Sequence, residues 1–174
     1  MESTCVLGMR DASFFATDLF FEAFGQAFPK PQTTTRLSIQ TPRDSWYQYV
    51  AFYKWSETNV EPVAFVNFIR HGDVYLEGGL CARRNFYRRL SPDHWRECKA
   101  RGGIVQMLLE HAMRERDDAD AWFGHTSIKP AFVVSERLGF ERTRYPYLIV
   151  KWFRELPEAR KREIEAQIDA IGSF

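Results

Sequence analysis

Three strand-forming segments between residues 46 and 82 restrict the fold more than any other feature of the sequence. They are residues 46–55, 63–69 and 74–82, and all are rich in aromatic and β-branched side chains. The first link contains the turn Ser56-Glu57-Thr58-Asn59, and the second is His71-Gly72-Asp73. Short links join antiparallel neighbours, because a parallel pair needs a longer crossover. We therefore expect an antiparallel meander at the centre of the fold.

An apolar helix is predicted before this meander. It begins near Ser13 and runs to about Phe28, where Pro29 ends it. Its apolar surface is wider than one stripe, so we expect it to be buried on more than one side, either in the core or as the wall of a substrate or dimer site. Short strands are also possible at residues 4–9 and 34–39.

The second half of the chain alternates between helices and strands. The predicted helices begin at Ser91-Pro92-Asp93, span Ile104–Arg116 and Pro130–Leu138, and follow Pro157; strands are expected at Ala121–His125 and within Arg142–Phe153. This order indicates a mixed α/β (α+β) fold with a mostly antiparallel central sheet flanked by helices. We expect one domain over residues 1–174, with 156–174 as a C-terminal helical extension. The isoleucines of that extension could face this domain or a partner.

Charge and cysteine content narrow the range of partners. Lys and Arg number 24 and Asp and Glu number 23, so we expect no nucleic-acid or membrane partner. Cys5, Cys81 and Cys98 show no metal-ligand spacing, and their odd number favours a reducing compartment. No apolar run approaches the length of about 20 residues that spans a bilayer. We therefore expect a cytoplasmic protein without a bound metal.

A glycine pair opens the most strongly helical segment. The stretch Arg101-Gly102-Gly103-Ile104-Val105 places small residues where the first backbone N–H groups of a helix lack internal partners. Such a helix start suits a diphosphate. The basic residues Arg83, Arg84, Arg88 and Arg89 lie upstream and could reach a further phosphate. The alternative is a plain turn beside a solvated basic loop.

A second motif follows at a characteristic distance. Ser135-Glu136-Arg137-Leu138-Gly139-Phe140 ends a short helix and leads into a strand. The order strand, glycine turn, helix, strand, helix with Gly-Phe, strand resembles the GNAT superfamily of acyl-coenzyme A-dependent N-acyltransferases. The resemblance covers about residues 60–153, and the first helix lies in a compatible place.

The resemblance implies acetyl-coenzyme A as co-substrate and a small-molecule or peptide amine as acceptor, with a homodimer as a possible assembly. Residues 74–82 would form the strand that pairs with the pantetheine arm. The residues implied for coenzyme A are Leu80, Cys81, Ala82, Arg101, Gly102, Gly103, Ile104 and Val105. The reaction would be direct attack of a primary amine on the acetyl thioester.

Glu77 is the candidate general base. Strand alternation places Tyr75, Glu77, Gly79 and Cys81 on one face, and a carboxylate in such apolar sequence should be paired or have a raised pKa. The alternative is a structural glutamate paired with an arginine. His125 ends the strand opposite and is either a base, an orienting group or an ordinary hydrogen-bonded loop histidine.

Ser135 stands where the family often has a tyrosine that protonates the departing thiolate, and Val105 stands at the second small position of the loop. Ser135 or, alternatively, Tyr145 is the candidate acid. Ser135 and Val105 also leave open a second reading, in which the GNAT fold serves as a non-catalytic binding or interaction module.

Overall fold

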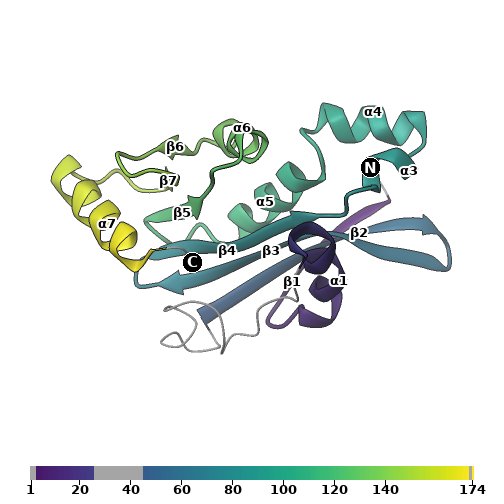
Figure 1. Ribbon diagram of the computed structural model, residues 1–174, viewed down its shortest axis with the longest axis horizontal. Coiled ribbons are helices and arrows are strands. Elements are labelled where there is room, and N and C mark those ends of the chain that lie inside the picture. The colour runs from purple at the N-terminus through teal and green to yellow at the C-terminus, as the bar shows by residue number, and fades with distance from the viewer. Residues whose placement is uncertain (1–2, 26–44, 173) are drawn as a thin grey trace.

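A seven-stranded sheet runs through the molecule in this computed structural model, which describes residues 3–25, 45–172 and 174 (Figure 1). The strands are β1 (Thr4–Met9), β2 (Trp46–Ser56), β3 (Asn59–His71), β4 (Val74–Ala82), β5 (Ala121–His125), β6 (Glu141–Arg142) and β7 (Leu148–Trp152). Their order in the sheet is β1-β2-β3-β4-β5-β7-β6. All neighbours are antiparallel except β4 and β5, which run parallel. The expected meander and mixed α/β class are confirmed.

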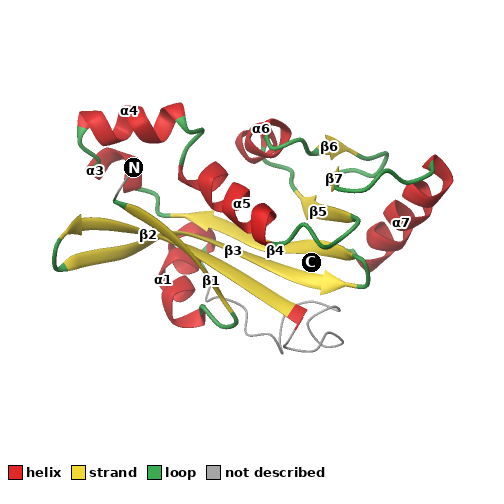
Figure 2. Cartoon of the chain, turned by 180° about the vertical axis from the view of Figure 1, so that it is seen from behind, coloured by secondary structure: helices red, strands yellow, loops and turns green. Residues whose placement is uncertain are grey.

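Helices cover both faces of this sheet. They are α1 (Ser13–Phe24), α3 (Phe86–Arg89), α4 (Pro92–Ala100), α5 (Ile104–Glu115), α6 (Lys129–Arg137) and α7 (Glu158–Ile171). The helix α1 lies on one side of the sheet, and α3, α4, α5 and α6 lie on the other (Figure 2). The single turn α3 was not expected from the sequence. The possible strand at residues 34–39 lies outside the described residues.

Local signals explain where the helices begin and end. The Ser91 hydroxyl accepts a hydrogen bond from His94 N at 3.3 Å, and Pro92 occupies the first turn of α4. The helix α1 ends earlier than predicted, because Gly25 adopts a left-handed conformation with φ of 68° and its N–H bonds to the Phe21 carbonyl.

Apolar clusters fix the helices on the sheet. On the α5 side, Tyr75 and Trp122 are fully buried in one cluster with Leu108. On the opposite face, Ile164 and Ile168 of α7 are buried in a cluster with strand residues Val74, Leu76, Ala121, Phe123, Leu148 and Val150. The isoleucine stripe of the C-terminal helix therefore packs on the sheet of its own chain.

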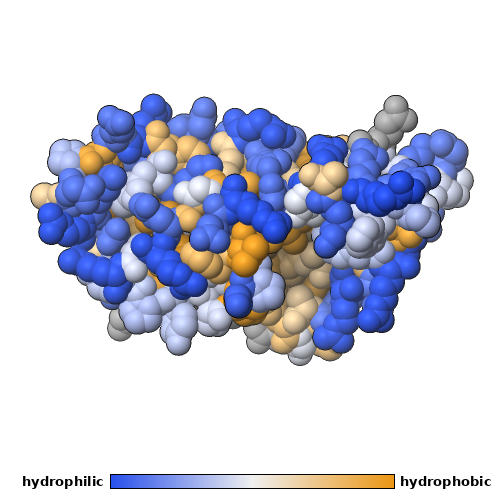
Figure 3. Space-filling model, turned by 90° about the horizontal axis from the view of Figure 1, so that it is seen from above, coloured by the Kyte–Doolittle hydropathy of each residue, from blue (hydrophilic) through white to orange (hydrophobic). Residues whose placement is uncertain are grey.

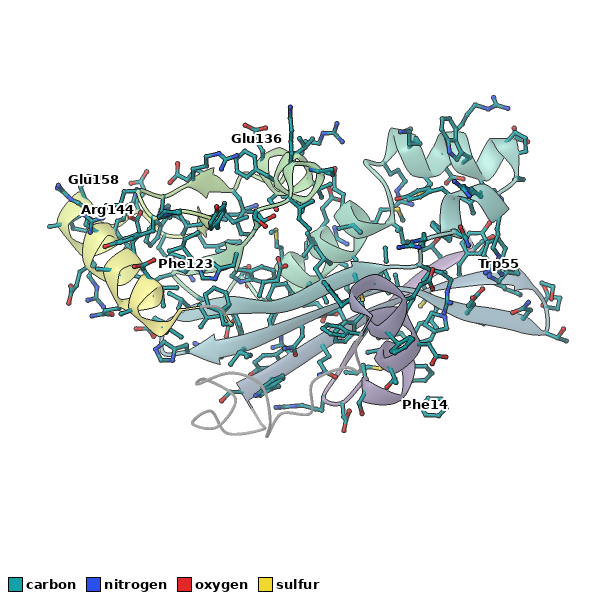
Figure 4. All side chains as sticks on the ribbon, viewed as in Figure 1. Phe14, Trp55, Phe123, Glu136, Arg144 and Glu158 are labelled. Carbon is teal, nitrogen blue, oxygen red and sulfur yellow. The ribbon has the colours of Figure 1, made fainter. Side chains whose placement is uncertain are left out.

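Burial of α1 differs from the expectation. Only one stripe of this helix, Ala16, Leu19 and Phe20, is buried against the sheet. Phe14 is 87% exposed and projects away from the sheet (Figure 4). The prediction that α1 is buried on more than one side is thus wrong for the described residues, because the sheet meets the helix along one side only.

One carboxylate ties the end of β4 to the rest of the sheet. Glu61 forms ion pairs with Arg83 Nε at 2.9 Å and Arg89 Nη2 at 2.7 Å, and it accepts a hydrogen bond from Trp55 Nε1 at 2.7 Å. Arg83 also pairs with Glu22 of α1 at 3.2 Å. Burial alone would raise the pKa of Glu61, but the arginines and the indole N–H together lower it. The network holds α1 and the exit of β4 in register.

We expect Glu61→Gln to lower the free energy of unfolding at pH 7 by about 1–2 kcal/mol, because two arginines lose their shared anion. The folded-state pKa of Glu61 is lowered, so its contribution is present above the unfolded pKa of about 4.3 and is lost as the pH falls through the folded value. Urea unfolding of both proteins between pH 3 and 7 measures the difference.

The matched control is Glu57→Gln, which removes an ion pair to Lys54 in which the glutamate side chain is 90% exposed. This control should lose less than about 0.5 kcal/mol. Equal losses in the two variants would contradict the assigned role of Glu61.

Candidate active site

The gap between β4 and β5 is the central feature of the site. Their parallel ladder has three residue pairs and ends at Leu76 and Phe123. Beyond this point β4 continues to Ala82 while β5 turns away from it (Figure 1). The β5-facing edge of residues 77–82 therefore has backbone N–H and C=O groups that no neighbouring strand takes up in the described ladder. The two strands therefore diverge after their third residue pair.

A β-bulge lies where the strands separate. Asn67 of β3 pairs with Gly79, whereas the next residue, Phe68, pairs with Glu77, so Gly78 is the extra residue. Gly79 has φ of 145°, a conformation that side chains rarely adopt. A Cβ on Gly78 would lie 2.8 Å from Asn67 Nδ2. Gly79 is therefore required by its backbone conformation, and Gly78 by its close contact with Asn67.

The bulge overturns the predicted alternation of β4. Tyr75 lies in the cluster beneath α5, whereas Cys81 is buried on the other face beneath α1. A Cβ on Gly79 would also approach the α1 side, at 3.3 Å from Phe20. Tyr75 and Glu77 therefore do not share a face with Gly79 and Cys81, because the extra residue reverses the side-chain direction after Glu77.

Glu77 reaches across the gap between the strands. Its Oε2 lies 3.6 Å from the position that a Cβ would take on Gly124 of β5. Removal from solvent raises the pKa of Glu77 to about 7. A carboxyl group with this pKa exchanges protons readily at neutral pH, as a general base requires.

His125 occupies the other side of the sheet. It pairs with Leu148 at the end of β5, and its ring stacks on Phe174 with centroids 4.7 Å apart. Burial lowers the pKa of His125, and Asp169 acts in the opposite direction. Glu77 and His125 thus flank the gap from opposite faces and do not form one cluster.

Ser135 is placed away from both groups. Its side chain is buried in α6, and its hydroxyl donates to the Ala131 carbonyl at 3.2 Å. This internal bond uses the proton that a general acid would give to a leaving group.

The glycine loop forms the junction between α4 and α5. Gly102 N and Gly103 N donate to the carbonyls of Lys99 and Cys98 at 3.0 and 2.8 Å. Ile104 N donates to the Tyr87 hydroxyl at 3.0 Å. Three of the amides expected to meet a phosphate are therefore occupied by protein groups, since the glycines also terminate α4.

Two further amides remain at the start of α5. In the described part of the chain, Val105 N and Gln106 N donate to no protein acceptor, as expected for the first turn of a helix. Gln106 lines an open pocket of about 560 Å³, together with Lys99, Ala100, Arg101, Gly102, Glu110 and Arg137. Three cationic side chains therefore surround this helix start.

The upstream arginines divide into two groups. Arg83 and Arg89 are held by Glu61 and are not directed to a phosphate, whereas Arg84 and Arg88 are exposed. Seen from the side of α4, α5 and α6, hydrophilic side chains cover most of the surface, and an apolar strip lies near its middle (Figure 3).

Comparison with solved structures identifies the fold. The ribosomal-protein-S18-alanine N-acetyltransferase from Escherichia coli superposes with a TM-score of 0.55 and 14% identity, covering 89% of this chain and 97% of that chain. An aminoglycoside 6'-N-acetyltransferase complexed with coenzyme A superposes with a TM-score of 0.56 and 10% identity, covering 88% of this chain and 99% of that chain. The putative N-acetyltransferase YhhK from E. coli, bound to coenzyme A, superposes with a TM-score of 0.54 and 16% identity, covering 86% of this chain and 98% of that chain. This chain has the GNAT fold.

Sequence comparison adds nothing to this result. No protein-family model matches the chain, and no curated protein matches it at the threshold applied. Within residues 3–25, 45–172 and 174, no helix is long and apolar enough to cross a membrane, and no group of three or more His, Cys, Asp or Glu side chains could hold a metal ion.

The GNAT fold brings together residues that sequence reasoning missed. Arg137 lines the pocket at the start of α5, and Tyr87 caps Ile104 N from the α3 turn. Phe174 reaches His125 from beyond α7. The free amides at Val105 and Gln106 could have been expected from the predicted helix start, whereas the other contacts depend on long-range packing.

Glu77→Gln tests the raised pKa without an activity assay. The folded-state pKa of Glu77 is raised to about 7, whereas the unfolded value is about 4.3. The neutral carboxyl group therefore contributes its full stability below about pH 4.3, and this contribution is lost as the pH rises through 7. The amide cannot ionise. We expect the variant to be more stable than wild type by about 1–3 kcal/mol at pH 9 and nearly equal at pH 4.

Denaturant unfolding at the two pH values measures this difference. Glu136→Gln, at an exposed position of α6, is the control and should show no such pH-dependent gain. If Glu77→Gln behaves like the control, the carboxyl group is not desolvated in the folded protein.

Proposed function

We propose that the protein is an N-acyltransferase that transfers acetyl from acetyl-coenzyme A to a primary amine by direct attack. The observation that carries this proposal is the gap between β4 and β5, with the Glu77 carboxyl group lying across it beside Gly124. The unpaired edge of β4 offers hydrogen bonds to an extended amide-containing chain such as pantetheine. Coenzyme A is bound in two of the similar structures.

The basic pocket at the start of α5 supports binding of the diphosphate end of the cofactor. The amides of Val105 and Gln106 lie in the first turn of α5, at the positive end of the helix dipole, and Arg101 and Arg137 line the adjoining pocket. We assign the cofactor contact to these amides in place of those of Gly102 and Gly103. Leu80, Cys81 and Ala82 would supply backbone groups along β4.

Proton transfer follows from the position of Glu77. An ammonium group with a pKa of about 10.4 costs roughly 4–5 kcal/mol to deprotonate at pH 7. Glu77 takes this proton, directly or through water. The nitrogen attacks the thioester carbonyl, the C–N bond forms and the C–S bond breaks. The nitrogen then loses a second proton, which the departing thiolate takes up, so that the products are an amide and a free thiol.

Amides of β4 near the bulge would stabilise the negative charge on the carbonyl oxygen, a contribution typically worth a factor of about 10² to 10³. The acid assigned from the sequence, Ser135, does not fit this step, since its proton is bonded to Ala131 O. A thiolate is a good leaving group, so no strong acid is needed at this position.

We expect Glu77→Gln to lower kcat for acetylation about 10²- to 10³-fold at pH 7, because the amide cannot accept the proton. The Kd for acetyl-coenzyme A should change little. Thiol release from acetyl-coenzyme A, measured against a panel of small-molecule and peptide amines, reports turnover. Glu57→Gln, far from the gap on the β2–β3 turn, should keep wild-type activity. Unchanged turnover in Glu77→Gln would exclude Glu77 as the base.

Arg137→Gln tests the cofactor pocket. Loss of one charge-assisted contact should weaken coenzyme A binding about 5- to 20-fold, while binding of pantetheine, which lacks the diphosphate, should not change. Isothermal titration calorimetry measures both. Arg160→Gln on the exposed face of α7 is the control, and an equal effect in this control would contradict a specific contact.

A second function remains supported by the occupied loop amides and by Ser135. In this case the protein would be a GNAT-fold module that binds coenzyme A without turnover. Coenzyme A at 100 times its Kd would add about 2.7 kcal/mol to the free energy of unfolding and so raise the melting temperature. No amine would be acetylated.

A further inference from the structure

We propose that Phe174 is a positioning residue whose ring fixes the His125 imidazole as the group that meets the acceptor amine on the α7 side of the sheet. This inference rests on the proposed acyltransferase function and adds to it the face from which the amine enters.

The contact itself is a parallel stack. The two rings lie with centroids 4.7 Å apart and planes inclined by 18°. Both side chains are half-buried. A stack of this kind restricts rotation of the imidazole and covers one of its faces, while leaving the ring nitrogens at the edge.

Packing of α7 explains why Phe174 reaches this point. Ile164 and Ile168 anchor the helix on the sheet beneath β4, β5 and β7, and Phe174 packs against the same cluster. The helix ends at Gly172, which has φ of 82° and so allows the chain to turn where other residues would be strained. The C-terminal segment therefore returns to the end of β5.

The direction of approach follows from strand alternation. Phe123 faces α7, so His125, two residues later in β5, faces the same side. Gly124 between them faces the α5 side, where Glu77 lies beside it. The basic pocket is also at the start of α5. A cofactor held from that side leaves the α7 side for the amine, which then meets His125 first.

The electrostatic surroundings make the imidazole suited to this task. Burial lowers the pKa of His125, so the ring is neutral at physiological pH and can accept a hydrogen bond from an amine. Among the described residues, the charged group that acts on it is Asp169 of α7, which raises its pKa, and Leu148 opposite it on β7 is apolar. Removal of the Phe174 ring should let water reach the imidazole and raise its pKa towards 6.5.

The experiment combines an NMR titration with a pH–rate profile. Imidazole C–H signals of wild type, Phe174→Leu and Phe174→Ala are followed between pH 4.5 and 9, and loss of one signal in His125→Asn identifies His125 among the four histidines. The pH dependence of kcat/KM is measured for the amine of the panel with the highest turnover, together with the Kd of acetyl-coenzyme A. Phe14→Leu, at an exposed position of α1, is the control.

Both Phe174 variants should raise the pKa of His125 and lower kcat/KM below pH 6, whereas the limb near pH 7, which the Glu77 carboxyl group sets, should not move. With a final pKa near 6.5, a shift of half to one unit would lower kcat/KM about three- to eightfold at pH 5, with less than about a twofold change at pH 8.5. The Kd of acetyl-coenzyme A and the behaviour of Phe14→Leu should match wild type. A merely structural role would change kcat/KM equally at all pH values.

An unmoved His125 titration in both variants overturns the inference, as does a variant-to-wild-type ratio of kcat/KM that is the same at pH 5 and pH 8.5 in an active enzyme. If wild type binds acetyl-coenzyme A but acetylates no amine, the proposed function fails, and this is recognised in the wild type itself. The NMR titration then decides alone whether Phe174 controls the His125 ring.

Discussion

The early end of the parallel ladder between β4 and β5 is the constraint on which the rest of the structure depends. Three residue pairs hold the strands together, and the bulge at Gly78 then changes the direction of β4. The bulge is possible because Gly79 tolerates its backbone conformation and Gly78 leaves room for Asn67. Without this divergence, the unpaired edge of β4 and the position of Glu77 across the gap would both be lost.

Much of the fold could be predicted from local patterns. The bounds of β4 and β5 follow from runs of apolar residues between clear turn signals, and short links dictated the antiparallel meander. The faces of β4 could not be predicted in this way. Alternation of side chains assumes a regular strand. The pair Gly78-Gly79 is compatible with a bulge, but the sequence does not show where the bulge lies, and so it does not show which face each neighbouring side chain takes.

The sequence predicted where α5 begins, but not the hydrogen bonds of the residues that precede it. The pair Gly102-Gly103 does open α5, yet these residues also end α4, so their N–H groups bond to its carbonyls. The choice between these partners depends on how α4 packs, which is a long-range property. The same limit applies to Phe174, whose contact with His125 depends on the anchoring of α7 across the opposite face.

Amide hydrogen exchange along β4 shows whether the edge of this strand is open and binds the cofactor. We expect the amides between residues 78 and 82 that face β5 to exchange quickly in the free protein and to become protected at saturating coenzyme A, together with those of Val105 and Gln106. Amides of the three-pair ladder, such as that of Tyr75, should be protected in both states. Unchanged exchange of residues 78–82 with the cofactor bound would contradict cofactor binding along the open edge of β4.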